Sequence, residues 1–182
     1  MELLGTGIVL PKYQEQVLRI WNEAYPTEFG FDDLKEFTRY LKCHNSPWHI
    51  LAFCGGEVIG WASAFNREGK RWFVVIVDQK YRKQGVGSAM LQALHGKGGP
   101  LHGWVIYEEH HLKDDGSPYH SPLPFYQHIG FEVTSETTDL GGFMARRVIS
   151  MPAQQEYVPR IHEIDCNKHQ PSRANDKRAA AV

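Results

Sequence analysis

The chain has 182 residues, 42% of them hydrophobic, which suits one domain with a packed core. The formal net charge of −1 gives no reason to expect nucleic acid or an acidic membrane as a partner, and no apolar run approaches the ~20 residues that cross a bilayer. No signal peptide is evident, and three cysteines without a C-x-x-C pair favour a reducing, cytoplasmic location.

The first part of the chain is predicted to form a strand, two helices and three more strands. Apolar residues Val17, Ile20, Trp21 and Ala24 follow the i, i+3, i+4, i+7 spacing of a helix. Glycine pairs and prolines separate the remaining segments. In chain order we expect a strand at 3–10 that Pro11 ends, helices at 14–25 and 31–43, a hairpin at 48–54 and 58–65, and a strand at 71–78.

A short basic turn follows that last strand and opens a helix predicted at 88–95. It contains Arg82, Lys83, Gly85 and Gly87. Two glycines one residue apart let the backbone approach a ligand closely, because no Cβ intervenes. The first N–H groups of a helix have no internal partner, and the helix dipole is positive there. The turn therefore predicts a site for a phosphate or pyrophosphate.

Two other phosphate-binding patterns fail on this segment. The dinucleotide fingerprint requires a third glycine where this chain has Met90, which disfavours a flavin or nicotinamide enzyme. A P-loop ending at Gly96 would need its first glycine at Leu91 and a Ser or Thr at Gly98. The remaining pattern, Arg-x-x-Gly-x-Gly after a hydrophobic strand, resembles the acyl-CoA pyrophosphate loop of the GNAT-type N-acetyltransferase superfamily.

A second motif lies downstream, where the chain reads Phe125-Tyr126-Gln127-His128-Ile129-Gly130-Phe131. We expect a short helix at 125–129 that ends at Gly130. The segment resembles the Phe-Tyr-x-x-x-Gly-Phe element of the same superfamily, in the same order along the chain. In that family the tyrosine lies near the CoA sulfur. The other elements expected here are a strand at 101–107, a long polar loop at 108–123, and strands at 131–135 and 143–149.

The resemblance implies a GNAT-like α/β fold, with a central mixed β-sheet flanked by helices on both faces. The predicted order β-α-α-β-β-β-α-β-α-β-β agrees with that fold. We expect the domain to span residues 1–150. Residues 151–182 are polar and contain three prolines, so we expect a mobile tail with one short strand near 157–161.

The resemblance also assigns roles to individual residues. Tyr126 would be the general acid for the leaving thiolate. The backbone of the strand would pair with the pantetheine arm and supply the oxyanion donor through Val75, Ile76 and Val77. The pyrophosphate loop would consist of Arg82, Lys83, Gln84, Gly85, Val86, Gly87 and Ser88.

The residue that takes a proton from the acceptor is harder to find. Many family members have a glutamate on the strand before the glycine loop, and residues 71–77 contain none. The nearest candidates are Glu108 and Glu109, followed by His110 and His111; a reaction without a dedicated base is the alternative. We expect no metal site, because adjacent histidines do not share a face in regular structure. Tyr119 also stands where the family often has an asparagine that touches CoA.

The sequence therefore predicts transfer of an acetyl group from acetyl-CoA to an amine of a small molecule or protein, by direct attack in a ternary complex. The alternative is a non-catalytic acyl-CoA-binding sensor or interaction domain. The missing strand glutamate favours the alternative slightly, and the retained Tyr126 argues against it. We expect a monomer or a homodimer.

Overall fold

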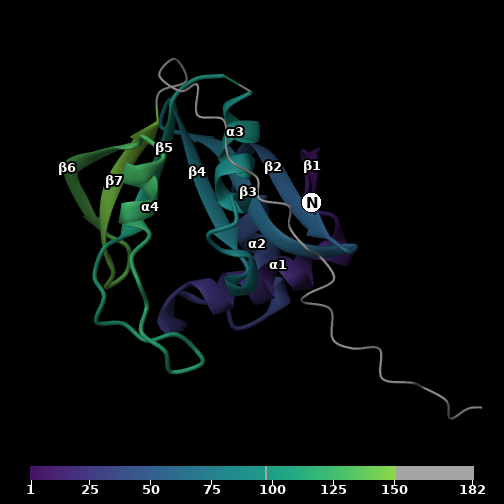
Figure 1. The fold of residues 1–182 in the computed structure, drawn as a ribbon, viewed down its shortest axis with the longest axis horizontal. Helices are drawn as coiled ribbons and strands as arrows, with labels where there is room; N and C mark the ends of the chain where they lie inside the picture. Colours follow the sequence, from purple (N-terminus) through teal and green to yellow (C-terminus); the bar gives the residue numbers. More distant parts are fainter. Residues whose placement is uncertain (97, 151–182) are drawn as a thin grey trace, which may run out of the picture.

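In the computed structural model, which describes residues 1–96 and 98–150, seven strands form one mixed sheet. Their spatial order is β1-β2-β3-β4-β5-β7-β6 (Figure 1). All neighbouring strands are antiparallel except β4 and β5, which are parallel. The strands are β1 Glu2–Thr6, β2 Asn45–Cys54, β3 Glu57–Arg67, β4 Lys70–Val77, β5 Leu101–Ile106, β6 Glu132–Asp139 and β7 Met144–Ser150.

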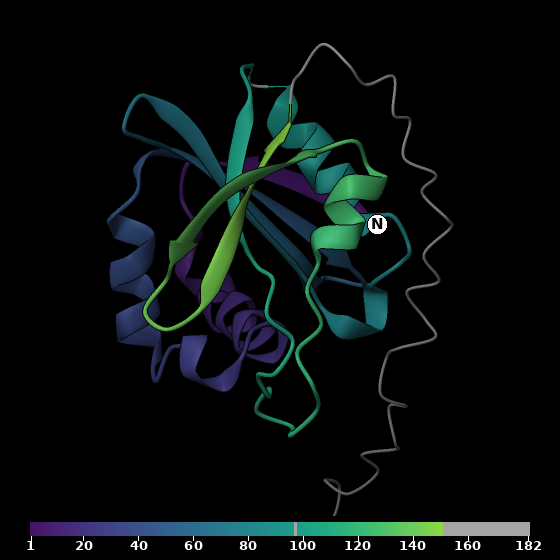
Figure 2. The same cartoon turned by 90° about the vertical axis from the view of Figure 1, so that its left-hand side faces the viewer.

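Helices cover both faces of this sheet (Figure 2). Helices α1 and α2 lie on one face, and α3 and α4 lie on the other. Two short 3₁₀ turns, η1 and η2, precede α2 and α3. The helices are α1 Pro11–Ala24, α2 Leu34–Lys42, α3 Val86–His95 and α4 Leu123–His128, and the turns are η1 Thr27–Phe29 and η2 Gln79–Tyr81.

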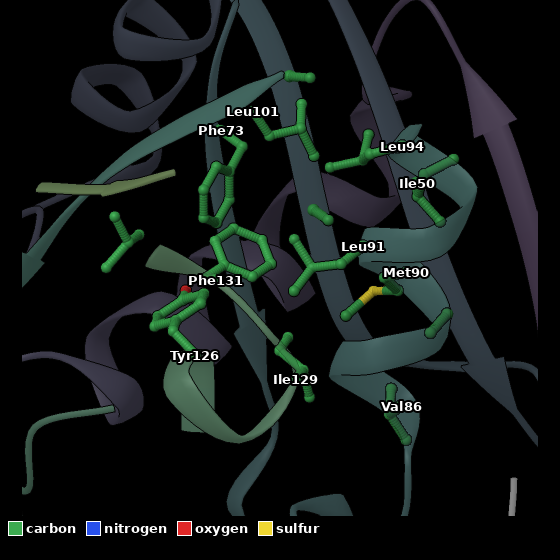
Figure 3. Close-up of a cluster of buried hydrophobic side chains, with 14 of the residues drawn as sticks. Ile50, Phe73, Val86, Met90, Leu91, Leu94, Leu101, Tyr126, Ile129 and Phe131 are labelled. Atoms are coloured by element: carbon green, nitrogen blue, oxygen red, sulfur yellow. The ribbon is translucent and has the colours of Figure 1, made fainter. Parts of the chain in front are cut away.

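Each face of the sheet has its own hydrophobic core. Under α1 and α2, the fully buried Trp61 of β3 packs with Ile20 and Phe37. Under α3 and α4, one core cluster contains Met90 and Leu91 of α3 together with the aromatic side chains of Phe73 and Phe131 (Figure 3). The side chains of a strand alternate between faces, so β3 and β4 supply both cores and are held firmly in place.

The parallel pair in the middle of the sheet separates soon after it forms. β4 and β5 are in register only at Arg71 with Leu101 and at Trp72 with His102. Beyond Trp72, β4 continues to Val77 with β3 on one side only, while β5 pairs with β7. The backbone edge of β4 that faces β5 is therefore open where a strand would otherwise lie.

The predicted order of elements is confirmed, and several boundaries differ. The strand expected at 3–10 ends at Thr6, and the helix expected at 14 begins at Pro11. Proline suits the first position of a helix, because its missing N–H would have no partner there. Likewise α3 begins at Val86 rather than at residue 88, because Gly85 with φ 86° serves as the N-cap. The tail and strand predicted within 151–182 lie outside the described residues.

Gly103 of β5 allows the closest packing in the core around Tyr126. A Cβ atom at this position would lie 2.7 Å from Cε1 of Phe73, whose ring contacts those of Tyr126 and Phe131. Overpacking of this kind costs about 1–3 kcal/mol, so we expect Gly103→Ala to lower the free energy of unfolding by that amount. Urea denaturation measures the change.

Gly7→Ala is the matched control for this substitution, because a Cβ atom there meets no atom within 4 Å. It is expected to leave the free energy of unfolding within about 0.5 kcal/mol of the native value. Equal stability of the two variants would contradict the tight packing described for Gly103.

Candidate active site

A cleft of about 990 Å³ occupies the opening between β4 and β5. Its walls come from the end of β4, the turn and start of α3, strand β5, the segment before α4, and α4 itself. Tyr25, at the end of α1, also lines it, although α1 lies on the opposite face from α3 and α4. The cleft therefore extends through the plane of the sheet, and a ligand on one face can meet a ligand on the other.

The basic turn forms one end of this cleft. Lys83 and Gly85 have left-handed φ values of 61° and 86°, which reverse the chain immediately before α3. The first backbone N–H that bonds back into the helix is that of Ala89, to the carbonyl of Gly85 at 2.9 Å. The N–H groups of residues 86–88 precede it and have no partner one turn back. The turn can thus present several N–H donors to an anion.

The residues predicted for the pyrophosphate loop come together here with one exception. Arg82, Lys83 and residues 85–88 line the cleft. Gln84 is not part of the lining, since its amide donates to the carbonyl of Lys80 at 2.9 Å. Arg82 is also held in place, because its Nε donates to the carbonyl of Val77 at 3.1 Å. The guanidinium thereby links the end of β4 to the turn.

The three strand residues predicted to bind pantetheine also line the cleft. Val75, Ile76 and Val77 belong to the part of β4 that has no β5 partner. Val75 and Val77 contact the core beneath α3 and α4, whereas Ile76 is buried beneath α1. Their side chains fill both cores while their backbone edge faces the opening, so packing and ligand binding do not compete.

Tyr126 lies on α4, in the wall of the cleft. Its ring centroid is 5.7 Å from that of Phe73 and 5.3 Å from that of Phe131 (Figure 3). The residue is 5% exposed. Burial raises the pKa of the Tyr126 hydroxyl well above 10, and the nearby Tyr25 and Tyr119 add to the shift. The phenol therefore stays protonated over the range in which enzymes usually work.

Neither glutamate predicted as a base lines the cleft. One Glu108 carboxylate oxygen accepts a hydrogen bond from the backbone N–H of Met144 at 3.0 Å, which lowers the pKa of Glu108. Glu109 accepts from the backbone N–H of Ser121 at 3.3 Å. Both carboxylates thus connect the long loop to its surroundings. Ser121 is the neighbour of His120, a residue that does line the cleft.

The structure adds lining residues that motif reasoning did not single out. Among them are Tyr25, Trp104 and His120. Trp104 lies on β5, and its position in the cleft depends on how far that strand diverges from β4. Tyr119, at the position of the family asparagine, also lines the cleft, and its hydroxyl donates to the carbonyl of Ile106 at 3.4 Å. No spacing in the sequence signals Tyr25, Trp104 or His120.

The cleft combines an open strand edge, a glycine-bearing helix start and a tyrosine across the opening. Residues 46–133 match the family described as "Acetyltransferase (GNAT) domain". The chain therefore has a GNAT-like fold, and its match to this family covers a little under half of its residues. A comparison with curated proteins gave no match.

Solved structures of this fold include several acetyltransferases. An aminoglycoside 6'-N-acetyltransferase complexed with coenzyme A superposes with a TM-score of 0.64 at 13% identity, over 85% of this chain and 99% of that one. The aminoglycoside 6'-N-acetyltransferase from Enterococcus faecium gives 0.63 at 13% identity, over 85% and 99%. An N-acetyltransferase from Staphylococcus aureus Mu50 gives 0.60 at 15% identity, over 84% and 99%. At these identities the likeness concerns the fold.

Within residues 1–96 and 98–150, no helix is long and apolar enough to cross a membrane.

Proposed function

We propose that this protein is an N-acetyltransferase that moves the acetyl group of acetyl-CoA to an amine by direct attack in a ternary complex. The observation that carries the proposal is the cleft, which begins at the N-terminus of α3 and continues between β4 and β5 to Tyr25 on the other face. Two substrates can enter from opposite faces and meet in the opening. The fold neighbour complexed with coenzyme A supports the choice of cofactor.

Acetyl-CoA would enter on the face of α3 and α4. Its pyrophosphate would accept hydrogen bonds from the N–H groups that start α3, with Arg82 and Lys83 supplying positive charge. The amide-rich pantetheine arm would continue the sheet beside residues 75–77, replacing the strand partner that β4 lacks there. This arrangement would bring the thioester towards Tyr126.

The acceptor would enter on the face of α1, past Tyr25 and Trp104. No Asp or Glu is present among the described residues that line the cleft. A polycationic acceptor would find no carboxylate there, so a monoamine with an apolar or aromatic body fits the lining better. An aminoglycoside, the substrate named for two fold neighbours, is the contrasting compound to assay beside it.

The chemical step would form a bond between the amine nitrogen and the thioester carbon, and then break the carbon–sulfur bond. A backbone N–H of β4 would donate to the carbonyl oxygen while it carries negative charge. Tyr126 would donate its hydroxyl hydrogen to the departing sulfur, and the resulting phenolate would regain a proton through water. Burial in the wall of the cleft destabilises the charged thiolate as well as the charged phenolate. Proton transfer from the Tyr126 hydroxyl to the sulfur therefore still assists the reaction, although the pKa of Tyr126 is high.

The proton lost by the amine requires an acceptor, and we propose that it passes through water to the segment that carries His120 and Glu109. His120 lines the cleft, and Glu109 holds the neighbouring Ser121 through its backbone N–H. An imidazole can exchange a proton near neutral pH. Glu108 is the less suitable of the two predicted glutamates, because its carboxylate accepts from Met144, which does not line the cleft, whereas that of Glu109 accepts from the neighbour of His120.

His120→Asn is expected to lower kcat at pH 7 by about 10²-fold, the smaller end of the usual contribution of acid–base catalysis. The KM for acetyl-CoA should stay within a factor of two or three of the native value, because His120 belongs to the segment before α4 rather than to the phosphate turn. Steady-state kinetics with a fixed amine measure both constants.

Glu28→Gln serves as the control for the loss of an ionisable side chain near the cleft. Glu28 lies in η1 and is exposed, and it is not part of the cleft lining. Its replacement should leave kcat unchanged. A kcat of the His120→Asn variant equal to that of the native protein would remove His120 from the proposed proton path.

The proposed acetyltransferase activity is tested by measuring thiol release from acetyl-CoA with a panel of amines. The panel includes arylalkylamines, polyamines, an aminoglycoside and a lysine peptide. Amine-dependent release, with the acetylated amine identified by mass spectrometry, would support it. Tight acetyl-CoA binding with no amine-dependent release across the panel would favour the alternative of a non-catalytic acyl-CoA-binding domain.

A further inference from the structure

The loop between β5 and α4 contains a cluster of metal-ligand side chains away from the acyl-CoA cleft. It consists of Glu108, His110 and His111, and one ligand atom from each lies within 4.8 Å of the others. Regular structure would separate adjacent histidines, but this stretch is neither helix nor strand. The expectation of no metal site rested on regular geometry, which the chain does not have here.

The distances in the cluster suit coordination of one ion. Nε2 of His111 lies 3.5 Å from a carboxylate oxygen of Glu108. Two ligands bound to a tetrahedral zinc at about 2.0–2.2 Å lie roughly 3.4 Å from each other. A cation between these two atoms would therefore require almost no movement of the pair. The ring of His110 is stacked 4.1 Å from that of His111.

The surroundings hold two of the three side chains before any ion binds. The same Glu108 oxygen accepts from the backbone N–H of Met144 at 3.0 Å, and the His111 ring packs 4.6 Å from that of Phe143. Groups that orient a ligand in this way contribute to metal affinity, because less freedom is lost on binding. His110 is exposed and gives the ion a route from solvent.

The backbone around the cluster is fixed as well. The carbonyl of His111 accepts from Tyr119 N–H at 2.9 Å, and that of Leu112 accepts from Thr27 N–H at 3.0 Å. These bonds tie the loop to itself and to the start of η1. The three donors therefore stay close together rather than belonging to a freely moving segment.

We propose that Glu108, His110 and His111 bind one late first-row divalent cation, of which zinc is the representative. Two imidazoles and one carboxylate match zinc, nickel, cobalt or copper, whereas magnesium and calcium prefer sets made of oxygen ligands. Water would complete the coordination. The bound ion would fasten the loop to the start of β7, and Tyr119 and His120 of the same loop line the acyl-CoA cleft.

Isothermal titration of the chelator-treated full chain with zinc chloride tests this site independently of any acetyl transfer. We expect one zinc per chain, with affinity at least tenfold weaker in each of Glu108→Gln, His110→Asn and His111→Asn. Glu108→Gln retains a carbonyl oxygen for the Met144 N–H, and circular dichroism establishes that each variant is folded. His120→Asn, in the same loop but outside the cluster, should bind zinc as the native chain does.

Cobalt substitution provides a second readout, because residues 151–182 contain Cys166 and two histidines, His162 and His169. Binding at the proposed site gives the visible bands of cobalt with nitrogen and oxygen ligands, and these bands should be lost in His111→Asn. A thiolate charge-transfer band, zinc affinity unchanged in all three variants, or no zinc binding at all would overturn the proposal.

Discussion

Gly87→Glu is expected to abolish acetyl-CoA binding, with an affinity at least 10³-fold weaker by calorimetry. Gly87 is the second residue of α3, where the free N–H groups face the cleft. A glutamate would put a negative charge beside the pyrophosphate, at a helix end whose dipole favours anions. Its side chain would also occupy space needed by the ligand, since a Cβ atom there already lies 3.3 Å from Phe125 and 3.6 Å from Val77.

Two further substitutions separate the effect of charge from that of volume. Gly87→Gln has nearly the same volume without the charge, and we expect it to bind acetyl-CoA weakly but measurably. Gly87→Ala adds only the Cβ atom, which Phe125 can accommodate by a small shift, and it should lose less than tenfold in affinity. Thermal unfolding of each variant shows whether the domain is intact. A folded Gly87→Glu variant that binds acetyl-CoA normally would contradict the placement of the pyrophosphate at α3.

The order of the elements was predictable because it depends on patterns local in the sequence. Trp21 and its apolar neighbours repeat with helical spacing, and Gly130 ends α4 in a left-handed conformation as its sequence position indicates. The helix starts were predicted less well. Pro11 was interpreted as the end of a strand, although its backbone is equally suited to open a helix, and the choice depends on where α1 packs.

The position of the residues proposed to bind acyl-CoA was also predictable, since it follows from one short turn. Arg82, Lys83 and Gly85 are close in sequence, so the turn that positions them needs only local information. Ser88 and Tyr126 both line the cleft as the two motifs indicated. The motif did not distinguish Gln84, whose side chain turns back to Lys80.

The side of the cleft proposed for the acceptor could not be predicted, because it is assembled from segments far apart in the chain. Tyr25 and Trp104 meet at the opening only because β5 leaves β4 after a two-residue register. The loop that follows β5 has no periodic pattern to constrain it. Glu108 and Glu109 follow β5 as expected, but the sequence did not indicate that neither of them lines the cleft. The proximity of the His110 ring to the His111 ring was also missed.

Tyr126→Phe is expected to lower kcat by about 10²-fold while acetyl-CoA binding stays within a factor of two of the native value. The substitution removes one oxygen and keeps the ring that packs against Phe73 and Phe131. The rate loss is placed at the low end of the range for acid catalysis, since a thiolate is a moderately good leaving group without assistance. Single-turnover kinetics with a saturating amine isolate the chemical step from product release.

Tyr13→Phe is the matched control, because Tyr13 packs edge-on against Phe53 and is not part of the cleft lining. Its kcat should equal that of the native chain.

The pH dependence of the native rate gives a further check. Burial raises the pKa of Tyr126 well above 10, so the hydroxyl stays protonated up to and beyond pH 10. The native rate should then show no loss from Tyr126 ionisation between pH 6 and about 10. Equal kcat values for Tyr126→Phe and the native chain would assign the tyrosine to packing alone, and the departing thiolate would have to be stabilised by water or by backbone groups of the cleft.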